Sequence, residues 1–287
     1  MIAVTGINGF IGSSLHRYLC NIFFDVCGLS TNPRQDNIIK LVDGVPQSSI
    51  QDLKQVIHCG GLIGNGFHKA DYLYANVECT RNLLNWCEKQ RVEHFLFFST
   101  GAVYEPRKDW VDENAVLNPI GAYAESKLIA ERLVLQSSIP IKTIIRLYFP
   151  IGGLQDKHVF SRMAHSIQDG KPVFVNNQQG HPYISPIYIY DVCRITELMI
   201  LGKLSDTYNL SNNFGIAIGE IIDLIARFYK VQPLKDIKGI DGEFYLGISD
   251  KIVAATGYEK FISTQSAINS LLVGEDAIGD KEMENGR

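Results

Sequence analysis

The sequence predicts an α/β fold in which a doubly wound parallel sheet is followed by a smaller region of mixed structure. Strand-like and helix-like segments alternate up to about residue 150, which is typical of a parallel sheet with helices on both faces. The first strand-like segment, at residues 2–5, runs directly into Gly6, Gly9 and Gly12 and then into a helical pattern. This order is typical of a turn that binds a dinucleotide.

Each glycine of this turn has its own expected use. Gly6 lets the chain leave the strand sharply, Gly9 removes the Cβ where a pyrophosphate would approach, and Gly12 lets the helix lie close to the sheet. The amide groups at the start of the helix would face the phosphates. An ordinary strand-turn-helix bend is the alternative, and the flanking strand and helix disfavour it. Other residues expected to line the cofactor here are Asn8, Phe10 and Ile11.

The residues after the second strand are expected to read the adenosine ribose. Apolar positions at 15, 19, 22 and 23 predict a helix, and residues 25–29 predict a strand that completes a βαβ unit. An acidic residue after that strand would favour NAD, whereas small polar residues with an arginine would accommodate NADP. Here Ser30 and Arg34 slightly favour NADP, although a solvated loop explains Arg34 equally well.

Two further segments are candidates for the cofactor site. Strands are predicted at residues 38–42 and 53–58, and the second ends in small residues on which a flat ligand could lie. A turn that needs glycine is the alternative interpretation. A long helix is predicted at residues 72–90, and its polar Asn76 either caps or solvates the helix or faces the cofactor. The small residues after the strand are Cys59, Gly60 and Gly61.

Chemistry is predicted where a buried strand at residues 94–100 precedes a helix that starts near Tyr123. Tyr123 and Lys127 are four residues apart and therefore share one face of that helix. Free tyrosine has a pKa near 10 and is a poor base at neutral pH, and a nearby ammonium would lower that pKa. Ser99 or Thr100 could hold the oxygen of an alcohol or ketone during hydride transfer. A solvent-facing Tyr-Lys pair is the alternative, which the preceding strand and the glycine turn disfavour.

The regular alternation ends near residue 150, after a predicted strand at residues 141–147. We expect a dinucleotide-binding domain at residues 1–150, a smaller substrate-binding lid at 151–273 interleaved with the last strands, and a disordered tail at 274–287. In the second region the patterns predict helices at 160–167, 190–200 and 218–229, a strand at 172–176 and irregular structure at 180–186.

Composition limits the partners and the compartment. The 287 residues are 46% hydrophobic and 20% charged with a formal net charge of −4, and no block of Lys or Arg favours a nucleic acid or an anionic membrane surface. No apolar run of about 18 residues could span a bilayer, and the strand at 2–5 leaves no room for a signal peptide, so a cytoplasmic protein is expected. The six cysteines lack the spacing of metal ligands and are expected to be buried free thiols.

A series of short motifs occurs in a fixed order along the chain. It includes Thr-Gly-Ile-Asn-Gly-Phe-Ile-Gly at 5–12, Ser-Thr-Gly-Ala-Val-Tyr at 99–104 and Tyr-Ala-Glu-Ser-Lys at 123–127, with others at 56–58, 76–77, 146–152, 187–191 and 208–210. Together they resemble the extended short-chain dehydrogenase/reductase family, in its epimerase and dehydratase branch that acts on nucleotide sugars. The resemblance implies a Rossmann-type sheet and a homodimer formed through the helices at 72–90 and 123–135.

The resemblance also implies roles for single residues. Thr100 would hold the substrate oxygen, Tyr123 would be the acid/base, and Lys127 would activate it and bind the nicotinamide ribose. Asn76 would lie near the nicotinamide. The other residues that the resemblance places against the cofactor are Ser99, Tyr148, Pro150 and Ile151.

Some positions depart from the family pattern. Gly101 and Ala102 stand where the sugar dehydratases carry an Asp-Glu pair, so dehydratase activity is not expected. Phe149 replaces an asparagine and Ile184 replaces an arginine, and in the family both of these help to hold the substrate diphosphate. The grip on a diphosphate is therefore expected to be weaker here.

The leading prediction is an oxidoreductase that uses NADP or NAD and acts on a sugar hydroxyl or ketone. Its most specific form is a nucleotide-4-keto-6-deoxysugar reductase of surface-polysaccharide biosynthesis, with a nucleotide-activated sugar as partner. The first alternative is a nucleotide-sugar 4-epimerase that uses the same residues with retained NAD. The second is a non-catalytic dinucleotide-binding sensor, which would have no use for Thr100, Tyr123 and Lys127 together.

Overall fold

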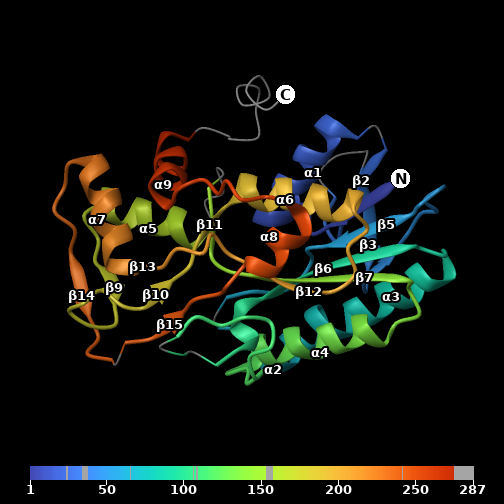
Figure 1. Ribbon diagram of the computed structural model, residues 1–287, viewed down its shortest axis with the longest axis horizontal. Helices are drawn as coiled ribbons and strands as arrows, with labels where there is room; N and C mark the ends of the chain where they lie inside the picture. The colour runs from blue at the N-terminus through green and yellow to red at the C-terminus, as the bar shows by residue number, and fades with distance from the viewer. Residues whose placement is uncertain are drawn as a thin grey trace. The chain divides into compact units, whose positions relative to one another are not determined.

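The computed structural model describes residues 1–23, 25–33, 38–64, 66–105, 107, 109–152, 158–240 and 242–274. Its main sheet contains β1 (Ile2–Thr5), β2 (Val26–Ser30), β3 (Ile38–Val42), β4 (Val45–Pro46), β5 (Gln55–His58), β6 (His94–Thr100), β7 (Ile141–Leu147) and β12 (Thr207–Leu210). These eight strands lie in the order β12-β7-β6-β5-β1-β2-β3-β4 (Figure 1). Neighbouring strands are parallel in the pairs β2–β3, β1–β2, β1–β5, β5–β6 and β6–β7, and β4 is antiparallel to β3. The predicted doubly wound α/β fold is confirmed.

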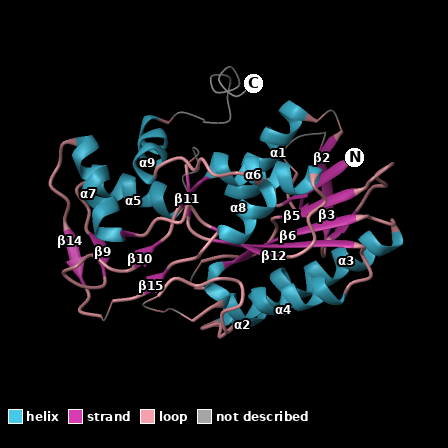
Figure 2. Cartoon of the chain, in the orientation of Figure 1, coloured by secondary structure: helices cyan, strands magenta, loops and turns pink. Residues whose placement is uncertain are grey.

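Helices cover both faces of this sheet. α1 (Phe10–Ile22) packs on one face, and α3 (Cys79–Lys89) and α4 (Ala122–Gln136) pack on the other, as Figure 1 and Figure 2 show. Leu15 and Leu19 are fully buried on α1, as their helical spacing predicts. A cluster of buried apolar side chains joins the sheet to α3 and α4, and it includes Phe95 and Phe97 from β6.

The register of the strands brings polar residues to one end of the sheet. Thr5 at the end of β1 pairs with His58 at the end of β5. Thr100 ends β6. We call this end, where the parallel strands finish, the carboxyl end of the sheet; His94, which begins β6, lies at the opposite, amino end. Open α/β sheets bind their ligands at the carboxyl end.

The helix predicted at residues 72–90 is interrupted in the structure. It consists of α2 (Lys69–Tyr72), the π-helical turn η1 (Leu73–Glu78) and then α3. Asn76 lies within the π-helical turn and is only 1% exposed. The interpretation of Asn76 as a solvated residue of a regular helix is therefore wrong, and π-helical turns occur frequently at functional sites.

The chain divides into two compact units. Unit 1 comprises Met1–Glu105, Ala115–Leu147 and Thr196–Tyr208, and unit 2 comprises Pro106–Asn114, Tyr148–Ile195 and Asn209–Arg287. The assignment of cofactor and substrate binding to residues 1–150 and 151–273 stays a prediction.

Unit 2 is built from short elements. Its helices include α5 (Val159–Gln168), α7 (Ile218–Tyr229), α8 (Asp250–Thr256) and α9 (Thr264–Val273), and α6 (Ile189–Leu201) begins in it. Among the described residues it has one three-stranded sheet, in the order β13 (Ile216–Ala217), β10 (Tyr183–Ile184) and β15 (Phe244–Tyr245). Two strand pairs accompany it: β8 (Pro150–Ile151) with β11 (Ile187–Tyr188), and β9 (Val173–Val175) with β14 (Lys235–Ile237). The segment 180–186, predicted to be irregular, contributes β10, a strand too short to leave an alternating pattern.

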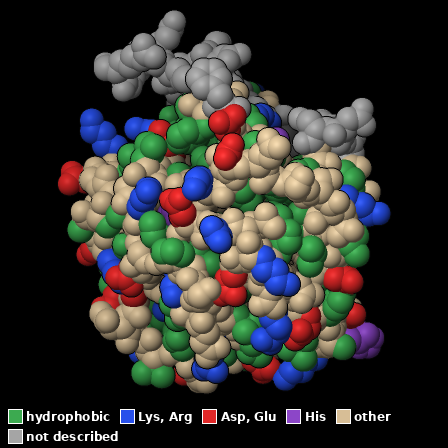
Figure 3. All heavy atoms as spheres, turned by 90° about the vertical axis from the view of Figure 1, so that its right-hand side faces the viewer, with side chains coloured by type: hydrophobic (Ala, Val, Ile, Leu, Met, Phe, Trp, Pro, Cys, Tyr) green, Lys and Arg blue, Asp and Glu red, His purple; other side chains and the backbone are tan. Residues whose placement is uncertain are grey.

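The sequence also predicts a mixed surface charge, the absence of a membrane span and buried free cysteines. On the face drawn in Figure 3, Lys and Arg side chains are interspersed with Asp and Glu. Within the described part of the chain, every helix is too short or too polar to cross a membrane. All six cysteines are free, but Cys20 is exposed and only Cys87 and Cys193 are fully buried, so the prediction of buried thiols is correct in part.

Candidate active site at the carboxyl end of the sheet

The glycine turn after β1 has the geometry that a dinucleotide needs. Gly6 has φ +69°, and a Cβ on it would lie 2.8 Å from the backbone of Cys59. A Cβ on Gly12 would lie 2.3 Å from the carbonyl oxygen of Gly6, so α1 approaches the turn too closely for any side chain there. Gly9 is exposed and caps α1 without a side chain. The residues at the start of α1 therefore fit a bound pyrophosphate.

Asn8 ties this turn to the end of β2. Its Nδ2 donates to Ser30 Oγ at 2.7 Å and to the carbonyl oxygen of Asn32 at 2.7 Å. Ser30 Oγ also accepts from the amide of Asn32 at 3.1 Å. Ser30 is thus fixed at the position expected to read the ribose, and residues 30–33 include no acidic side chain. Arg34, the other residue of this prediction, lies outside the described residues.

The loop after β5 lies against β1 and the π-helical turn. The amide of Gly60 donates to Thr5 Oγ1 at 3.0 Å. A Cβ on Gly61 would lie 2.9 Å from Asn76 Oδ1, which explains the need for glycine at that position. Asn76 Oδ1 accepts from the amide of Leu62 at 2.6 Å, and its Nδ2 donates to the carbonyl of Leu62 at 3.0 Å. Asn76 therefore clamps the loop, and its predicted contact with the nicotinamide stays a prediction.

The structure brings Thr100 and Tyr123 together. Burial raises the pKa of Tyr123 to about 12, and the nearby Thr100 hydroxyl has a smaller, opposite effect. Tyr72, whose ring centroid lies 6.2 Å from that of Tyr123, also raises it. Thr100 Oγ1 accepts from the amide of Ala102 in the following turn. Tyr123 is therefore a protonated phenol at neutral pH in this structure.

Lys127 is buried one helical turn from Tyr123. Its Nζ donates to the carbonyl oxygen of Phe98 at 2.6 Å and lies 4.1 Å from the centre of the Phe97 ring. Burial lowers the pKa of Lys127 to about 8, and the charges of Glu131 and Cys59 oppose this shift. The Lys127 ammonium contacts the carbonyl oxygen of Phe98. The pKa of Tyr123 is therefore shifted by burial, by Thr100 and by Tyr72.

A buried ionic network beside Lys127 was not anticipated from the sequence. Arg146 Nη2 lies 2.8 Å from Glu131 Oε2, and its Nη1 donates to the Tyr104 hydroxyl at 2.6 Å. Ser99 donates its hydroxyl to Glu131 Oε1, and its predicted contact with the cofactor stays a prediction. The only sequence signal was the position of Glu131 four residues after Lys127, on the same helical face.

The remaining predicted cofactor residues belong to unit 2. Tyr148 is buried, and Pro150 and Ile151 form β8, which pairs with β11. Their contact with a dinucleotide stays a prediction. Phe149, which replaces the family's asparagine, has φ +33°, a conformation that asparagine and glycine adopt more readily. Ile184, which replaces the family's arginine, is fully buried in β10.

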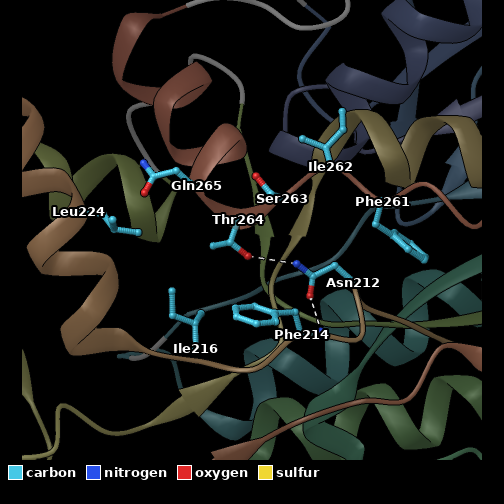
Figure 4. A pocket seen from close by; sticks show the side chains of 9 residues that line it. All are labelled: Asn212, Phe214, Ile216, Leu224, Phe261, Ile262, Ser263, Thr264 and Gln265. Carbon is cyan, nitrogen blue, oxygen red and sulfur yellow. Dashed lines mark hydrogen bonds between the residues drawn. The ribbon is translucent and has the colours of Figure 1, made fainter.

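Unit 2 contains a pocket of about 410 Å³ (Figure 4). Asn212 Nδ2 donates to Thr264 Oγ1 across it at 3.1 Å. None of the side chains that line it titrates near neutral pH, so it could bind a ligand but not exchange a proton with one. They are Asn212, Phe214, Ile216, Leu224, Phe261, Ile262, Ser263, Thr264 and Gln265.

Comparison with known proteins confirms what the motifs suggested. Residues 2–211 match the NAD dependent epimerase/dehydratase family. The chain belongs to this family. The match covers the glycine turn, the loop after β5, Thr100, Tyr123 and Lys127. It confirms the resemblance to the extended short-chain dehydrogenases/reductases.

Two curated members of this family illustrate its range. The uncharacterised UDP-glucose epimerase YtcB of Bacillus subtilis (strain 168) is 29% identical over 171 residues, which cover 56% of this chain and about half, 52%, of that relative. The putative UDP-glucose 4-epimerase of Methanocaldococcus jannaschii is 27% identical over 309 aligned positions, which cover 95% of this chain and 97% of the relative.

Solved family structures share the fold along nearly the whole chain. The UDP-glucuronic acid 4-epimerase of Bacillus cereus, in complex with UDP-glucuronic acid and NAD, matches with a TM-score of 0.84 and 21% identity over 95% of this chain and 98% of that one. The UDP-glucose 4-epimerase of Thermus thermophilus, in complex with NAD, matches with a TM-score of 0.82 and 20% identity over the same shares, 95% and 98%.

Proposed function

We propose that this protein is a nucleotide-sugar 4-epimerase that retains NAD through its catalytic cycle. The observation that carries the proposal is the placement of Tyr123 beside Thr100, whose hydroxyl lowers the pKa of the phenol, one helical turn from the buried Lys127 and in the unit that holds the glycine turn. The names of the curated relatives support the same reaction. They favour the epimerase over the reductase that the sequence alone favoured.

The residues of this site suit a reaction that removes a hydride and returns it. NAD, when bound, would supply the hydride acceptor, the cationic nicotinamide ring. As the phenolate, Tyr123 would take the proton from the sugar O4 as the hydride leaves C4, and would give it back to the 4-ketone when the hydride returns to the other face. Thr100 would hold O4 during both steps. In this structure Lys127 donates to the carbonyl oxygen of Phe98 and does not shift the pKa of Tyr123. Together with the positive charge of bound NAD, an ammonium turned toward the phenol would favour the phenolate form that accepts this proton.

The two residues after Thr100 argue against dehydration, the second activity in the family's name. Elimination of water needs a carboxylic acid to protonate the leaving hydroxyl. Thr100 is followed here by Gly101 and Ala102, which form a 3₁₀ turn and offer no acidic side chain. We therefore include no dehydration step.

Reduction of a 4-ketosugar by NADPH is the second candidate. It is motivated by Ser30, which ends β2 without an acidic residue beside it. Ser30 Oγ already accepts hydrogen bonds from Asn8 and Asn32, so only its own hydrogen is left to contact a ribose hydroxyl or a 2′-phosphate. This contact suits either cofactor, and the choice of NAD follows from the proposed epimerase cycle.

The proposal is tested by the cofactor content and the products of the purified protein. Denatured protein should release about one NAD per chain, and native protein should interconvert UDP-glucose and UDP-galactose, or the corresponding uronic acids, without added cofactor. Sugar products are separated by anion-exchange chromatography. NADPH consumption in proportion to product, with no NAD released, would instead establish the reductase. The homodimer expected through residues 72–90 and 123–135 is tested in the same preparation by analytical ultracentrifugation.

A further inference from the structure

A chain of buried hydrogen bonds runs through His58 in unit 1. The amide of Gly60 donates to Thr5 Oγ1 at 3.0 Å, and Thr5 Oγ1 lies 2.7 Å from His58 Nδ1. On the other side of the ring, His58 Nε2 lies 3.0 Å from Thr80 Oγ1, which donates to the carbonyl oxygen of Asn76 at 2.8 Å. We call these five residues the His58 relay.

The ends of the relay fix the position of every hydrogen in it. The carbonyl of Asn76 can only accept, so the single hydroxyl hydrogen of Thr80 is used there. Thr80 Oγ1 must then accept from His58, which places a hydrogen on Nε2. The amide of Gly60 can only donate, so Thr5 accepts from it and is free to donate its own hydrogen to His58 Nδ1. This order places a hydrogen on Nε2, so a neutral His58 is in the Nε2–H tautomer and accepts from Thr5 at Nδ1.

The surroundings of His58 keep the ring neutral. It is only 5% exposed, and the rings of Phe95 and Phe97 lie 5.8 Å and 5.6 Å from it, between centroids. Burial, with a smaller contribution from the charge of Lys127, lowers the pKa of His58 to about 3. The relay therefore keeps one arrangement of hydrogens throughout the pH range in which enzymes of this kind operate.

The relay continues to the helical turn that carries Tyr123. Asn76 Nδ2 donates to Ser126 Oγ at 2.9 Å, and Ser126 donates to the carbonyl oxygen of Tyr123 at 2.7 Å. With its two bonds to Leu62, Asn76 has both side-chain hydrogens and its oxygen engaged. One ordered set of bonds thus joins the loop after β5, the π-helical turn and the first turn of α4.

We propose that His58 is a positioning residue, which sets the place of the Tyr123 hydroxyl by holding the π-helical turn and Asn76 in register with the glycine-containing loop after β5. The proposal rests on the proposed function of Tyr123 as the acid/base. His58 itself touches neither the sugar nor the reacting hydrogen in this account. It acts through Thr80, Asn76 and Ser126.

Substitutions of Thr80 test the proposal because they break the relay without removing the histidine. Thr80→Val keeps the shape of the side chain but cannot accept from His58 Nε2 or donate to Asn76, whereas Thr80→Ser can do both. We expect Thr80→Val to lower kcat by about 10- to 100-fold, with KM for the nucleotide sugar and the amount of bound NAD little changed. Thr80→Ser should recover most of the rate.

Thr143→Val is the matched control. Thr143 Oγ1 lies 2.7 Å from His94 Nε2 and donates to the carbonyl oxygen of Leu204, so the substitution removes an equally buried hydroxyl from an equivalent histidine. It should leave kcat within about twofold of the unsubstituted protein. Equal losses of kcat in Thr80→Val and Thr143→Val, each matching the loss of thermal stability, would overturn the proposal, as would full activity of Thr80→Val.

Nitrogen-15 NMR of the histidine rings supplies a readout that needs no substrate. His58 should show a protonated Nε2 and an unprotonated Nδ1, with no titration between pH 5 and pH 8, and its assignment comes from the spectrum of His58→Gln. A protonated Nδ1, or titration within that range, would overturn the relay. If the epimerase assay fails while His58 shows the expected tautomer, the proposed function fails and the relay stands.

Discussion

His58 and His94 are buried histidines at opposite ends of the central sheet, and their surroundings differ. Both have a threonine hydroxyl within hydrogen-bond distance of Nε2, and they are 5% and 1% exposed. His58 Nδ1 lies 2.7 Å from Thr5, whereas His94 Nδ1 has no hydrogen-bond partner among the described residues. At the carboxyl end the bonds continue to Asn76. At the amino end they stop at the carbonyl of Leu204.

The difference shows why burial alone does not identify a functional residue. A buried polar group has to be satisfied wherever it lies, and the pKa of both histidines is lowered mainly by burial. What distinguishes His58 is the destination of its hydrogen bonds, which reach the loops that follow the parallel strands. Substitutions at the carboxyl end should therefore affect the rate, and those at the amino end should affect only stability.

The largest expected effect is that of Tyr123→Phe at the carboxyl end. Loss of the phenolic hydroxyl should lower kcat by about 10²- to 10⁴-fold, because the proton of O4 then has no acceptor. Substrate binding and bound NAD should be retained. Tyr18→Phe is the control, since it removes a hydroxyl that donates to Glu197 at 2.6 Å outside the site. Undiminished turnover by Tyr123→Phe would show that Tyr123 is not the acid/base of the reaction.

Lys127→Met should separate activity from stability. The burial that lowers the pKa of Lys127 to about 8 shows that its charge opposes folding, while Glu131 keeps its partner Arg146 at 2.8 Å without it. We expect kcat to fall by about 10²-fold or more, and the free energy of unfolding to rise by about 1–4 kcal/mol. Urea titration monitored by circular dichroism measures the second effect. A less stable Lys127→Met protein would show that the ammonium contributes to folding.

At the amino end of the sheet we expect a smaller effect, on how the free energy of unfolding depends on pH. Burial lowers the pKa of His94 to about 4 from an unfolded value of 6.5, so the unfolded state binds more protons between these values. The stability that this group contributes is complete above pH 6.5 and is lost as the pH falls toward 4, by at most about 1.4 kcal/mol per pH unit. In His94→Gln this part of the slope should disappear while kcat stays unchanged. An unaltered slope would mean that His94 does not titrate as described.

Much of the sheet could be predicted because its strands are continuous apolar runs. β3, β6 and β7 begin and end where the sequence predicts, and Tyr123 and Lys127 lie on one face of α4 as their spacing requires. The π-helical turn could not be predicted, since its apolar spacing resembles that of an α-helix. The two-residue strands of unit 2 are too short to leave a periodic signal.

The polar contacts of the site were harder to predict than its residues. The register pairs Ser99 with Arg146 and places its hydroxyl on Glu131, a contact that the sequence did not suggest, and the contact with the cofactor that the resemblance implies for Ser99 stays a prediction. The partners of His58 come from β1 and α3, far apart in the sequence. Such contacts depend on strand register and helix packing, which composition and spacing do not specify.

Deuterium labelling of the sugar shows whether the hydrogen on C4 leaves and returns within the site. A UDP-sugar that carries deuterium at C4 is incubated with the purified protein without added cofactor, and the product is analysed by NMR and mass spectrometry. We expect a C4 epimer that keeps its deuterium on C4, because the hydride removed from one face returns to the other within the same site. Loss of deuterium from C4, or product formed only when NADPH is added, would contradict this mechanism.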